Sequence, residues 1–256
     1  MSTTALLALA EATAREAGAQ LRVAFARTDL LVASKSTPTD PVSEADQAAE
    51  TLIRERLTAA RPGDGILGEE EGDAAGTTGI RWIVDPLDGT VNFLFGIPQW
   101  AVSIACEDAD GAIAGVVYDP MRDEMWRAQR GGPARCNDTV LRGSDKSDLA
   151  HALFATGFGY EAEVRGVQGA AVARVLPQVR DIRRLGSAAL DLAWTAAGRY
   201  DVFYERGLKA WDLAAGALLC RQAGLEVVLL DPAPPLPSGV LVAPASLVEP
   251  VLALLD

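Results

Sequence analysis

The sequence predicts a mixed α/β fold, in which an α+β first half leads into a second half of alternating strands and helices. Long stretches near the N-terminus repeat apolar residues at helical spacing. In the middle of the chain, the apolar runs 100–108 and 112–120 flank Ala109-Asp110-Gly111, which is a strong hairpin signal. From about residue 135 onward, short apolar runs alternate with helical segments, as in α/β architectures.

The first half contains two helices and several strands. Residues 4–27 fit a helix, and a short strand with a polar, proline-containing loop follows from Leu30. We expect the next helix to have Ser43 as its N-cap and Asp46 at its third helical position, and to end at Pro62-Gly63. The remaining predicted elements are a strand ending in acidic residues (64–72), a flexible loop (73–79), a strand (80–85), a turn (86–90), the hairpin, and a strand with a glycine loop (124–138).

The second half alternates between the two kinds of element. We expect strands at 151–158, 181–186, 200–206, 226–230 and 239–244, and helices at 167–179, 187–198, 211–224 and 245–255. The change of pattern divides the chain into an N-terminal lobe, 1–134, and a C-terminal lobe, 135–256.

Composition narrows the class of protein. The 256 residues are 49% hydrophobic, which is enough for a sizeable core, and the net charge is −12. Such an acidic chain is a poor nucleic-acid binder, because nucleic acid needs a basic surface. No apolar run approaches the roughly 20 residues of a membrane-spanning helix. The N-terminal stretch contains Glu11, Arg15 and Glu16, so we interpret it as an amphipathic helix and not as a signal peptide.

Cysteine and histidine usage excludes several kinds of site. Cys106, Cys136 and Cys220 lie far apart and form no zinc pattern, so we expect a reducing, cytoplasmic setting. His151 is the one histidine, which excludes a multi-histidine metal site. Its neighbours read as an apolar strand, and we expect a histidine in the core or at a strand end.

Acidic residues gather where strands end or helices begin. Each has an ordinary explanation when taken singly, as a helix cap, a turn residue or a solvated charge. Together, Glu69, Asp85, Asp88 and Asp212 mark the places where ligands bind in α/β folds. The pair Asp85-x-x-Asp88, with carbonyl oxygens between, suits a hard cation such as Mg²⁺. Gly89-Thr90 then offers backbone N–H groups to a phosphate, so the sequence indicates phosphoryl chemistry.

Four ordered motifs resemble those of the inositol monophosphatase family of Mg²⁺-dependent phosphatases. They are DPVSEAD (40–46), GEEEG (68–72), WIVDPLDGTVNF (82–93) and KAWDLAAGALLCRQAG (209–224). The resemblance covers nearly the whole chain. It differs slightly at Ser43, where threonine is commoner, and at Leu225, where a second glycine is usual. The resemblance implies a layered αβαβα sandwich, and by analogy alone a homodimer.

The resemblance also implies a set of metal ligands. Glu69, Asp85 and the Leu87 carbonyl would hold one Mg²⁺, and Asp85, Asp88 and Asp212 a second. Glu69 would also contribute to a weaker third site, which gives two or three ions in all. Bound cations would explain why so many carboxylates lie together.

Further residues take roles in catalysis and substrate binding by the same resemblance. Thr90, hydrogen-bonded to Asp46, would orient the attacking water, and Glu69 would be a candidate base. The Gly89 and Thr90 amides would hold the phosphate. Lys35 and Ser36 would lie on a loop that closes over the site. The groups expected to contact the alcohol part of the substrate are Asp88, Gly186, Ser187, Ala188, Glu205 and Asp212.

The substrate stays open between members of the family. The stretch 92–105 and the residues 204–206 resemble the inositol monophosphatase branch, which favours inositol 1-phosphate or a similar sugar or polyol monophosphate. The alternatives are histidinol phosphate and fructose 1,6-bisphosphate, and the acidic surface argues against a nucleotide bisphosphate. A metal-stabilised binding or regulatory protein is the non-enzymatic alternative.

Two other phosphatase patterns are weaker. Cys136 and Arg142 fit the bare C-x₅-R of cysteine phosphatases, but Asp138 between them would point a negative charge at a phosphate. Residues 108–112 are close to a haloacid-dehalogenase motif, but they lie in the predicted hairpin turn.

Overall fold

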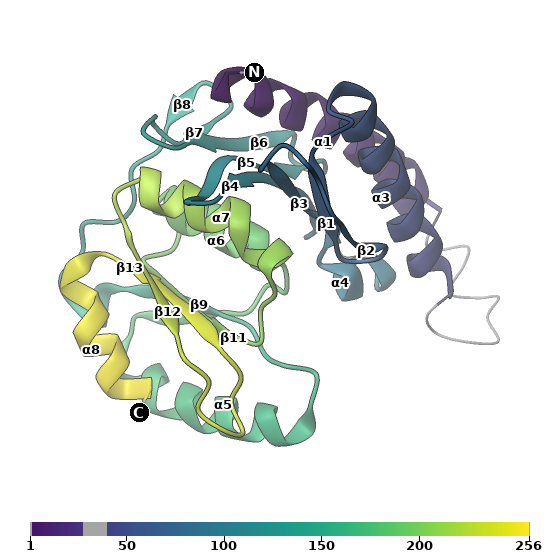
Figure 1. The fold of residues 1–256 in the computed structure, drawn as a ribbon. Coiled ribbons are helices and arrows are strands. Elements are labelled where there is room, and N and C mark those ends of the chain that lie inside the picture. The colour runs from purple at the N-terminus through teal and green to yellow at the C-terminus, as the bar shows by residue number, and fades with distance from the viewer. Residues whose placement is uncertain (1, 28–39, 256) are drawn as a thin grey trace.

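The computed structural model describes residues 2–27 and 40–255, and it forms five layers in the order αβαβα. Helices cover the outer face of each of two sheets, and further helices lie between the sheets (Figure 1). The predicted layered sandwich is therefore confirmed. Within the described residues, no helix is both long and apolar enough to cross a membrane.

The first sheet has eight strands in the order β2-β1-β3-β4-β5-β6-β7-β8. They are β1 (Gly65–Gly68), β2 (Gly72–Ala74), β3 (Arg81–Asp88), β4 (Ala101–Asp108), β5 (Gly111–Asp119), β6 (Glu124–Gln129), β7 (Arg135–Cys136) and β8 (Thr139–Val140). Strands β1 and β3 are parallel, and the other pairs are antiparallel. The predicted hairpin joins β4 to β5. The sheet ends at Val140, so its last two strands lie beyond residue 134, and the division into lobes there stays a prediction.

Helices α1 (Thr3–Phe25) and α3 (Asp40–Ala60) cover the outer face of the first sheet (Figure 1). Their buried apolar residues form one core with the sheet, around Trp82 and Trp100. Phe25, Phe93 and Trp100 stack with ring centroids 5.2–5.5 Å apart. Each such pair contributes about 0.5–1.5 kcal/mol beyond its buried area. This cluster fixes the short helix α4 (Thr90–Leu94) against the sheet.

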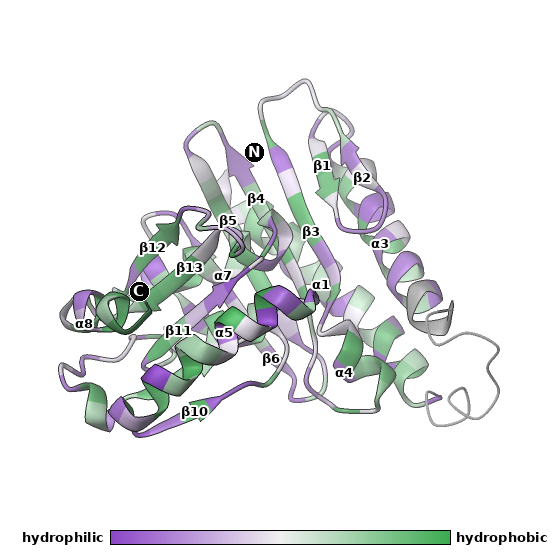
Figure 2. Ribbon diagram, turned by 90° about the horizontal axis from the view of Figure 1, so that it is seen from below, coloured by the Kyte–Doolittle hydropathy of each residue, from purple (hydrophilic) through white to green (hydrophobic). Residues whose placement is uncertain are grey.

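The second sheet has five strands in the order β10-β9-β11-β13-β12. They are β9 (Leu153–Thr156), β10 (Asp181–Arg183), β11 (Val202–Arg206), β12 (Glu226–Leu230) and β13 (Gly239–Ala243). Strand β13 is hydrophobic and fully buried (Figure 2). Helices α5 (Ala162–Val175) and α8 (Ala245–Leu255) close the outer face through a third apolar cluster. Short 3₁₀ turns occupy Leu149–His151 and Leu176–Gln178.

The middle layer consists of α6 (Ala188–Ala196) and α7 (Ala210–Gln222). Two glycines let α7 approach its neighbours closely. A Cβ at Gly115 would lie 3.0 Å from Ala215 Cα, and one at Gly216 would lie 2.6 Å from Leu192 Cβ. Helix α7 therefore packs tightly on both the first sheet and α6, and this brings its N-terminus beside the end of β3.

The structure corrects two local predictions. Helix α3 begins at Asp40, so Ser43 lies inside it and is not its N-cap. The physical reason is Pro41, whose fixed φ suits the first turn of a helix. Part of the predicted loop 73–79 is strand β2, because Gly72 adopts φ +72° and turns the chain back onto β1. The strand and loop expected from Leu30 lie mostly outside the described residues.

Of the two positions expected for His151, the core is wrong, and the histidine lies just before a strand. The His151 side chain is 68% exposed, and its Nδ1 lies 3.0 Å from the Asp148 carboxylate. The apolar run is real, but it begins two residues later at Leu153. His151 instead ends the 3₁₀ turn that leads into β9.

Candidate active site

Three carboxylates from distant parts of the chain meet between the first sheet and α7. Asp85 and Asp88 lie at the end of β3, and Asp212 lies in the first turn of α7. One oxygen from each lies within 4.8 Å of the others. Asp85 and Asp88 are only 1% and 8% exposed. The sequence prediction that these acids converge is therefore correct in geometry.

A β-bulge brings the two acids of β3 together. The pairing with β4 shifts register between Asp85 and Asp88, so the predicted turn at Pro86 is an irregularity within the strand. A bulge reorients the side chains beside it, which is why bulges occur next to functional sites. Asp85 Oδ1 also accepts a hydrogen bond from Leu87 N at 3.0 Å, which stabilises the bulge locally.

Backbone groups at two helix N-termini accompany the acids. Asp212 accepts a hydrogen bond from Lys209 N at 2.6 Å, just before α7. Asp88 accepts hydrogen bonds from Ala189 N at 2.8 Å and Ala188 N at 3.3 Å, at the start of α6, and from the Ser187 hydroxyl. Ser187 and Ala188 are thus brought to the site as predicted. Here their polar groups hold Asp88, which ties the first sheet to the middle layer.

Burial and mutual repulsion raise the pKa of these acids. The pKa of Asp88 rises to about 7, chiefly through burial and then through the charge of Asp212, although the hydrogen bonds from α6 oppose the rise. The pKa of Asp85 lies well above its usual 3.8, because the group is buried and faces the other acids. Burial also raises the pKa of Asp212. A cation would relieve this repulsion.

Glu69 follows directly after β1 and completes the acidic group. The residue is exposed as a whole, but loss of water around its carboxylate raises its pKa to about 7, with further contributions from Asp212, Glu70 and Asp88. Its charge therefore acts on the same acids that share the 4.8 Å cluster. This agrees with its predicted place beside them.

Asp46 lies on α3 and is 2% exposed. Burial, followed by the charges of Glu70, Glu69 and Glu50, raises its pKa to about 8. Its Oδ1 has no hydrogen-bond partner among the described residues. The expected bond from Thr90 is not formed. The Thr90 hydroxyl donates instead to the carbonyl of Leu87 at 3.0 Å, because a threonine three residues after a carbonyl reaches it within the same turn.

Gly89 forms the entry to α4 in a conformation that favours glycine. Its φ is +97°, and a Cβ there would lie 2.8 Å from the carbonyl oxygen of Gln99. Glycine allows both the left-handed backbone and the close approach. The N–H groups at the start of a helix have no acceptor within that helix, so Gly89 and Thr90 begin a segment with free donors next to Asp88.

Glu205, on β11, lies on the far side of Asp88. Burial and the charge of Asp88 raise its pKa to about 8, and Arg184 opposes the rise. A Cβ at Gly157 would lie 2.1 Å from the Glu205 carboxyl carbon, so the glycine leaves room for this side chain. Gly186, with φ +83°, lies in the same region, because a Cβ there would lie 2.4 Å from Nη1 of Arg184, the residue whose charge acts on Glu205.

Three residues near the site were missed by sequence reasoning. Asn92 Nδ2 donates to the carbonyls of Leu185 at 2.7 Å and Gln99 at 2.8 Å, and so joins α4 to the segment before α6. Asp191 is 1% exposed, its Oδ1 has no hydrogen-bond partner in the part of the chain that the structure describes, and its pKa is raised by burial and then by Glu205. Arg184 is the cation beside Glu205 and Asp191. Asn92 belongs to the motif WIVDPLDGTVNF (82–93), so its place in that motif could have marked it as a site residue.

The arrangement fits divalent-cation chemistry. Carboxylate and carbonyl oxygens are the ligands that Mg²⁺ prefers, and the free cysteines take no part in the cluster. The loop residues Lys35 and Ser36 lie outside the described residues.

Comparison with known proteins identifies the family. A sequence model of the Inositol monophosphatase family matches residues 3–254. The chain belongs to the inositol monophosphatase family. It is therefore a phosphoric monoester hydrolase, with the site built on the fold that this family shares.

Individual relatives agree. An inositol-1-monophosphatase of Mycobacterium bovis is 46% identical over 213 residues, which cover 80% of this chain and 73% of the relative. A protein of Salmonella typhimurium named Nus factor SuhB is 42% identical over 221 residues, with coverages of 86% and 83%. The crystal structure of the extragenic suppressor protein suhB from Bartonella henselae superimposes with a TM-score of 0.88 at 37% identity, over 98% of both chains.

Proposed function

We propose that the protein is a Mg²⁺-dependent phosphatase that hydrolyses inositol 1-phosphate or a similar sugar or polyol monophosphate. The observation that carries the proposal is the convergence of Asp85, Asp88 and Asp212 within 4.8 Å, next to the free N–H groups that begin α4. Cations held there would lie beside a place where a phosphate can bind. The family and the names of the relatives support the same reaction.

The residues present would hold two or three ions. Glu69, Asp85 and the Leu87 carbonyl form one set of ligands, Asp85, Asp88 and Asp212 a second, and Glu69 takes part in a weaker third. The Leu87 carbonyl can accept a cation as well as the Thr90 hydroxyl, because it has two lone pairs. When bound, Mg²⁺ supplies positive charge that attracts phosphate oxygens and lowers the pKa of water.

The protein groups would position the substrate and the water. The N–H groups of Gly89 and Thr90 hold phosphate oxygens, and the Thr90 hydroxyl orients the attacking water. Asp46 lies close enough to Glu69 for their charges to interact, and Glu69 would accept a proton. The water attacks phosphorus in line with the leaving alcohol, so no covalent phospho-enzyme is required.

The alcohol part of the substrate would meet polar groups of the middle layer and the second sheet. The Glu205 carboxylate and backbone carbonyl groups of the segment Gly186–Ala188 would accept hydrogen bonds from neighbouring hydroxyls, and Asp88 and Asp212 would border the same region. Several hydroxyls with directed acceptors favour a polyol over a simple alkyl phosphate.

The test is phosphate release with and without Mg²⁺ on a panel of substrates. We expect the highest kcat/KM for inositol 1-phosphate, ahead of histidinol phosphate and fructose 1,6-bisphosphate. A clear preference for one of the latter two would move the protein to that branch of the family. Release that is unaffected by EDTA would contradict the Mg²⁺ mechanism.

A second role as a binding or regulatory protein is supported by the relative named Nus factor SuhB. In that case the metal site would stabilise the fold instead of turning over substrate. Absence of phosphate release across the whole panel, together with measurable Mg²⁺ binding, would favour this role over the enzymatic one.

Assembly and location stay proposals. By analogy with the family, we propose that the protein is a homodimer. Because its cysteines are free, we propose that it is located in the cytoplasm. Light scattering on the purified chain checks the dimer. The closing role of Lys35 and Ser36 can be tested by Lys35→Ala, which should raise KM for Mg²⁺ or substrate if the loop covers the site.

A further inference from the structure

Helix α3 holds the tip of the β1–β2 hairpin through two side chains one turn apart. The Glu50 side chain is fully buried and accepts hydrogen bonds from Glu70 N at 2.8 Å and Glu71 N at 3.0 Å. Arg54 Nε donates to the same carboxylate at 2.8 Å, and Arg54 Nη2 donates to the carbonyl of Gly72 at 2.5 Å. Glu50 and Arg54 therefore grip the three-residue loop that begins with Glu69.

The grip also reaches the strand before the loop. A Cβ at Gly68 would lie 2.0 Å from Glu50 Oε1 and 2.5 Å from its carboxyl carbon. The carboxylate thus packs directly on the β1 backbone, in a space that only glycine leaves open. Gly68 and Gly72 are paired across the hairpin, so the contact fixes both ends of the loop.

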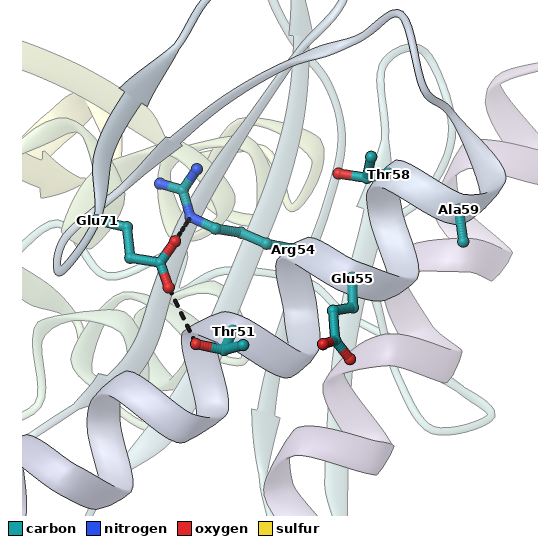
Figure 3. A pocket seen from close by; sticks show the side chains of 6 residues that line it. All are labelled: Thr51, Arg54, Glu55, Thr58, Ala59 and Glu71. Carbon is teal, nitrogen blue, oxygen red and sulfur yellow. Dashed lines mark hydrogen bonds and ion pairs between the residues drawn. The ribbon is translucent and has the colours of Figure 1, made fainter.

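The surroundings of Arg54 show that its charge is already satisfied. Figure 3 shows Arg54 and Thr51 both turned toward Glu71. Arg54 Nε lies 3.5 Å and Thr51 Oγ1 lies 3.0 Å from the Glu71 carboxylate oxygens. The open hollow that these residues line with Glu55 is therefore no anion site. Glu55 points away from the loop (Figure 3), and its side chain makes no hydrogen bond to another described residue.

We propose that Glu50 and Arg54 are positioning residues, which hold the loop 69–71 so that Glu69 faces the cations at Asp85 and Asp212. The inference rests on the function proposed above, because it takes Glu69 as a metal ligand. Glu69 is joined directly to Glu70, and its Cα lies about 3.8 Å from that of Glu70. The two amides held by Glu50 thus immediately follow the ligand.

Electrostatics explains why the loop needs such a grip. Glu69, Glu70 and Glu71 are consecutive acids, and the charges of Asp212 and Asp88 also act on Glu69. Repulsion favours turning Glu69 away from the site into water. Hydrogen bonds to a buried carboxylate are strong, and Arg54 supplies the partner that a buried charge requires. The hydrogen bonds from the loop to Glu50 and Arg54 therefore hold the loop in place, although the loop itself contains no basic residue.

A glutamine at position 50 would disrupt the hydrogen bonds of Glu50 without changing the size of the side chain. Its side chain has a single acceptor oxygen, and its NH₂ group would face an N–H donor of the loop or the guanidinium of Arg54. The matched control is Glu55→Gln, which removes the same charge from the same helix at an exposed position. The two variants separate the contact from the general loss of a negative charge.

Mg²⁺ binding to the whole chain, measured by titration calorimetry, is the primary assay, and the Mg²⁺ dependence of phosphate release is the second. We expect Glu50→Gln to weaken Mg²⁺ binding by about 10- to 100-fold, the range for residues that orient metal ligands. We expect Glu55→Gln to change it by less than about 2-fold. At saturating Mg²⁺, kcat of Glu50→Gln should return to within about 3-fold of the parent, because the ligand itself is intact.

Gly68→Ala provides an independent variant that alters no charge. Its Cβ would collide with the Glu50 carboxylate, so it should weaken Mg²⁺ binding in the same direction as Glu50→Gln. Shortening Glu50 to alanine makes room for that Cβ. The effects of Glu50→Ala and Gly68→Ala should therefore be less than additive in the double variant.

The outcomes separate this inference from the proposed function. If the parent chain binds Mg²⁺ and releases phosphate, while Glu50→Gln and Gly68→Ala bind Mg²⁺ as tightly as Glu55→Gln, the positioning role is overturned and the function stands. If the parent binds no Mg²⁺, both are overturned. If Glu50→Gln does not fold, Gly68→Ala decides.

Discussion

Replacing Asp85 by asparagine should destroy activity and stabilise the metal-free protein at the same time. Asp85 is 1% exposed and lies within 4.8 Å of Asp88 and Asp212 through its ligand oxygen. In the proposed mechanism it is shared by two cations, so its loss removes positive charge from the transition state. In the metal-free protein its charge only repels its neighbours. The same substitution therefore has opposite effects on function and on stability.

The direction of the stability effect follows from the raised pKa of Asp85. A carboxyl group whose pKa is raised by folding binds its proton more tightly than the unfolded chain does, where the pKa is 3.8, so folding becomes less favourable as the pH rises above that value. At pH 7 the cost is about 1.4 kcal/mol for each pH unit by which the pKa is raised, and near pH 4 it is almost nothing. Asparagine avoids the cost and can still accept the hydrogen bond from Leu87 N.

Thermal unfolding in EDTA and turnover in Mg²⁺ measure the two effects. We expect Asp85→Asn to raise Tm by about 4 °C or more at pH 7 and by little at pH 4.5, since 1 kcal/mol corresponds to about 2–4 °C for a chain of this length. We expect kcat to fall by at least about 10³-fold, equivalent to roughly 4 kcal/mol. Asp110→Asn, in the exposed hairpin turn, is the control and should change neither. A lower Tm at pH 7 would refute the repulsion argument, and near-normal kcat at saturating Mg²⁺ would refute the ligand assignment.

Three further outcomes can be checked on the same preparations. Gly89→Ala should cost about 1–3 kcal/mol of stability in denaturant unfolding, because φ is +97° and its Cβ would meet Gln99 O; an unchanged midpoint would contradict this. Gly157→Ala should displace Glu205 and raise KM for inositol 1-phosphate while leaving turnover of p-nitrophenyl phosphate nearly unchanged; equal losses on both substrates would argue against a polyol contact. In EDTA, stability should fall as pH rises from about 4 to about 8, because the raised pKa of Asp46 means that the folded state binds the extra proton throughout that window. A stability maximum at pH 8 in EDTA would contradict that sign.

The site was predictable where a residue's neighbours in the sequence indicate its position at a strand end or a helix start. Asp85, Asp88 and Asp212 each follow a strand or begin a helix, and such ends gather on one side of an α/β layer. The bulge that aims Asp85 and Asp88 at the same place was not predictable, because Pro86 there reads as an ordinary turn. Glu50 was missed since it lies in the middle of a helix, and only the tertiary approach of Gly68 gives it a role.

The same reasoning explains why Asp191 escaped detection and why most of the fold did not. Asp191 lies in an apolar helical segment, which gives no sign of a functional residue. Its raised pKa comes from burial and then from the charge of Glu205, which lies on a strand of the second sheet. The helices and strands themselves follow from apolar periodicity, which the sequence shows directly. Apolar periodicity does not show which side chains meet when they are about a hundred residues apart in the sequence. The hydrogen bonds from the start of α6 to Asp88 are an example.

Stability and metal binding are coupled in this arrangement. The first sheet, α7 and the loop after β1 each bring an acid to one place, and the bonds from α6 and Lys209 N offset only part of the repulsion. A ligand that binds only the folded state stabilises it by about 2.7 kcal/mol at a hundred times its Kd. Mg²⁺ at such a concentration would thus offset a large part of the loss of folding stability that the buried acids cause. Since that cost grows with pH, Mg²⁺ should stabilise the protein more at pH 8 than at pH 5, and a Tm shift with the opposite pH trend would be incompatible with a cation held by these carboxylates.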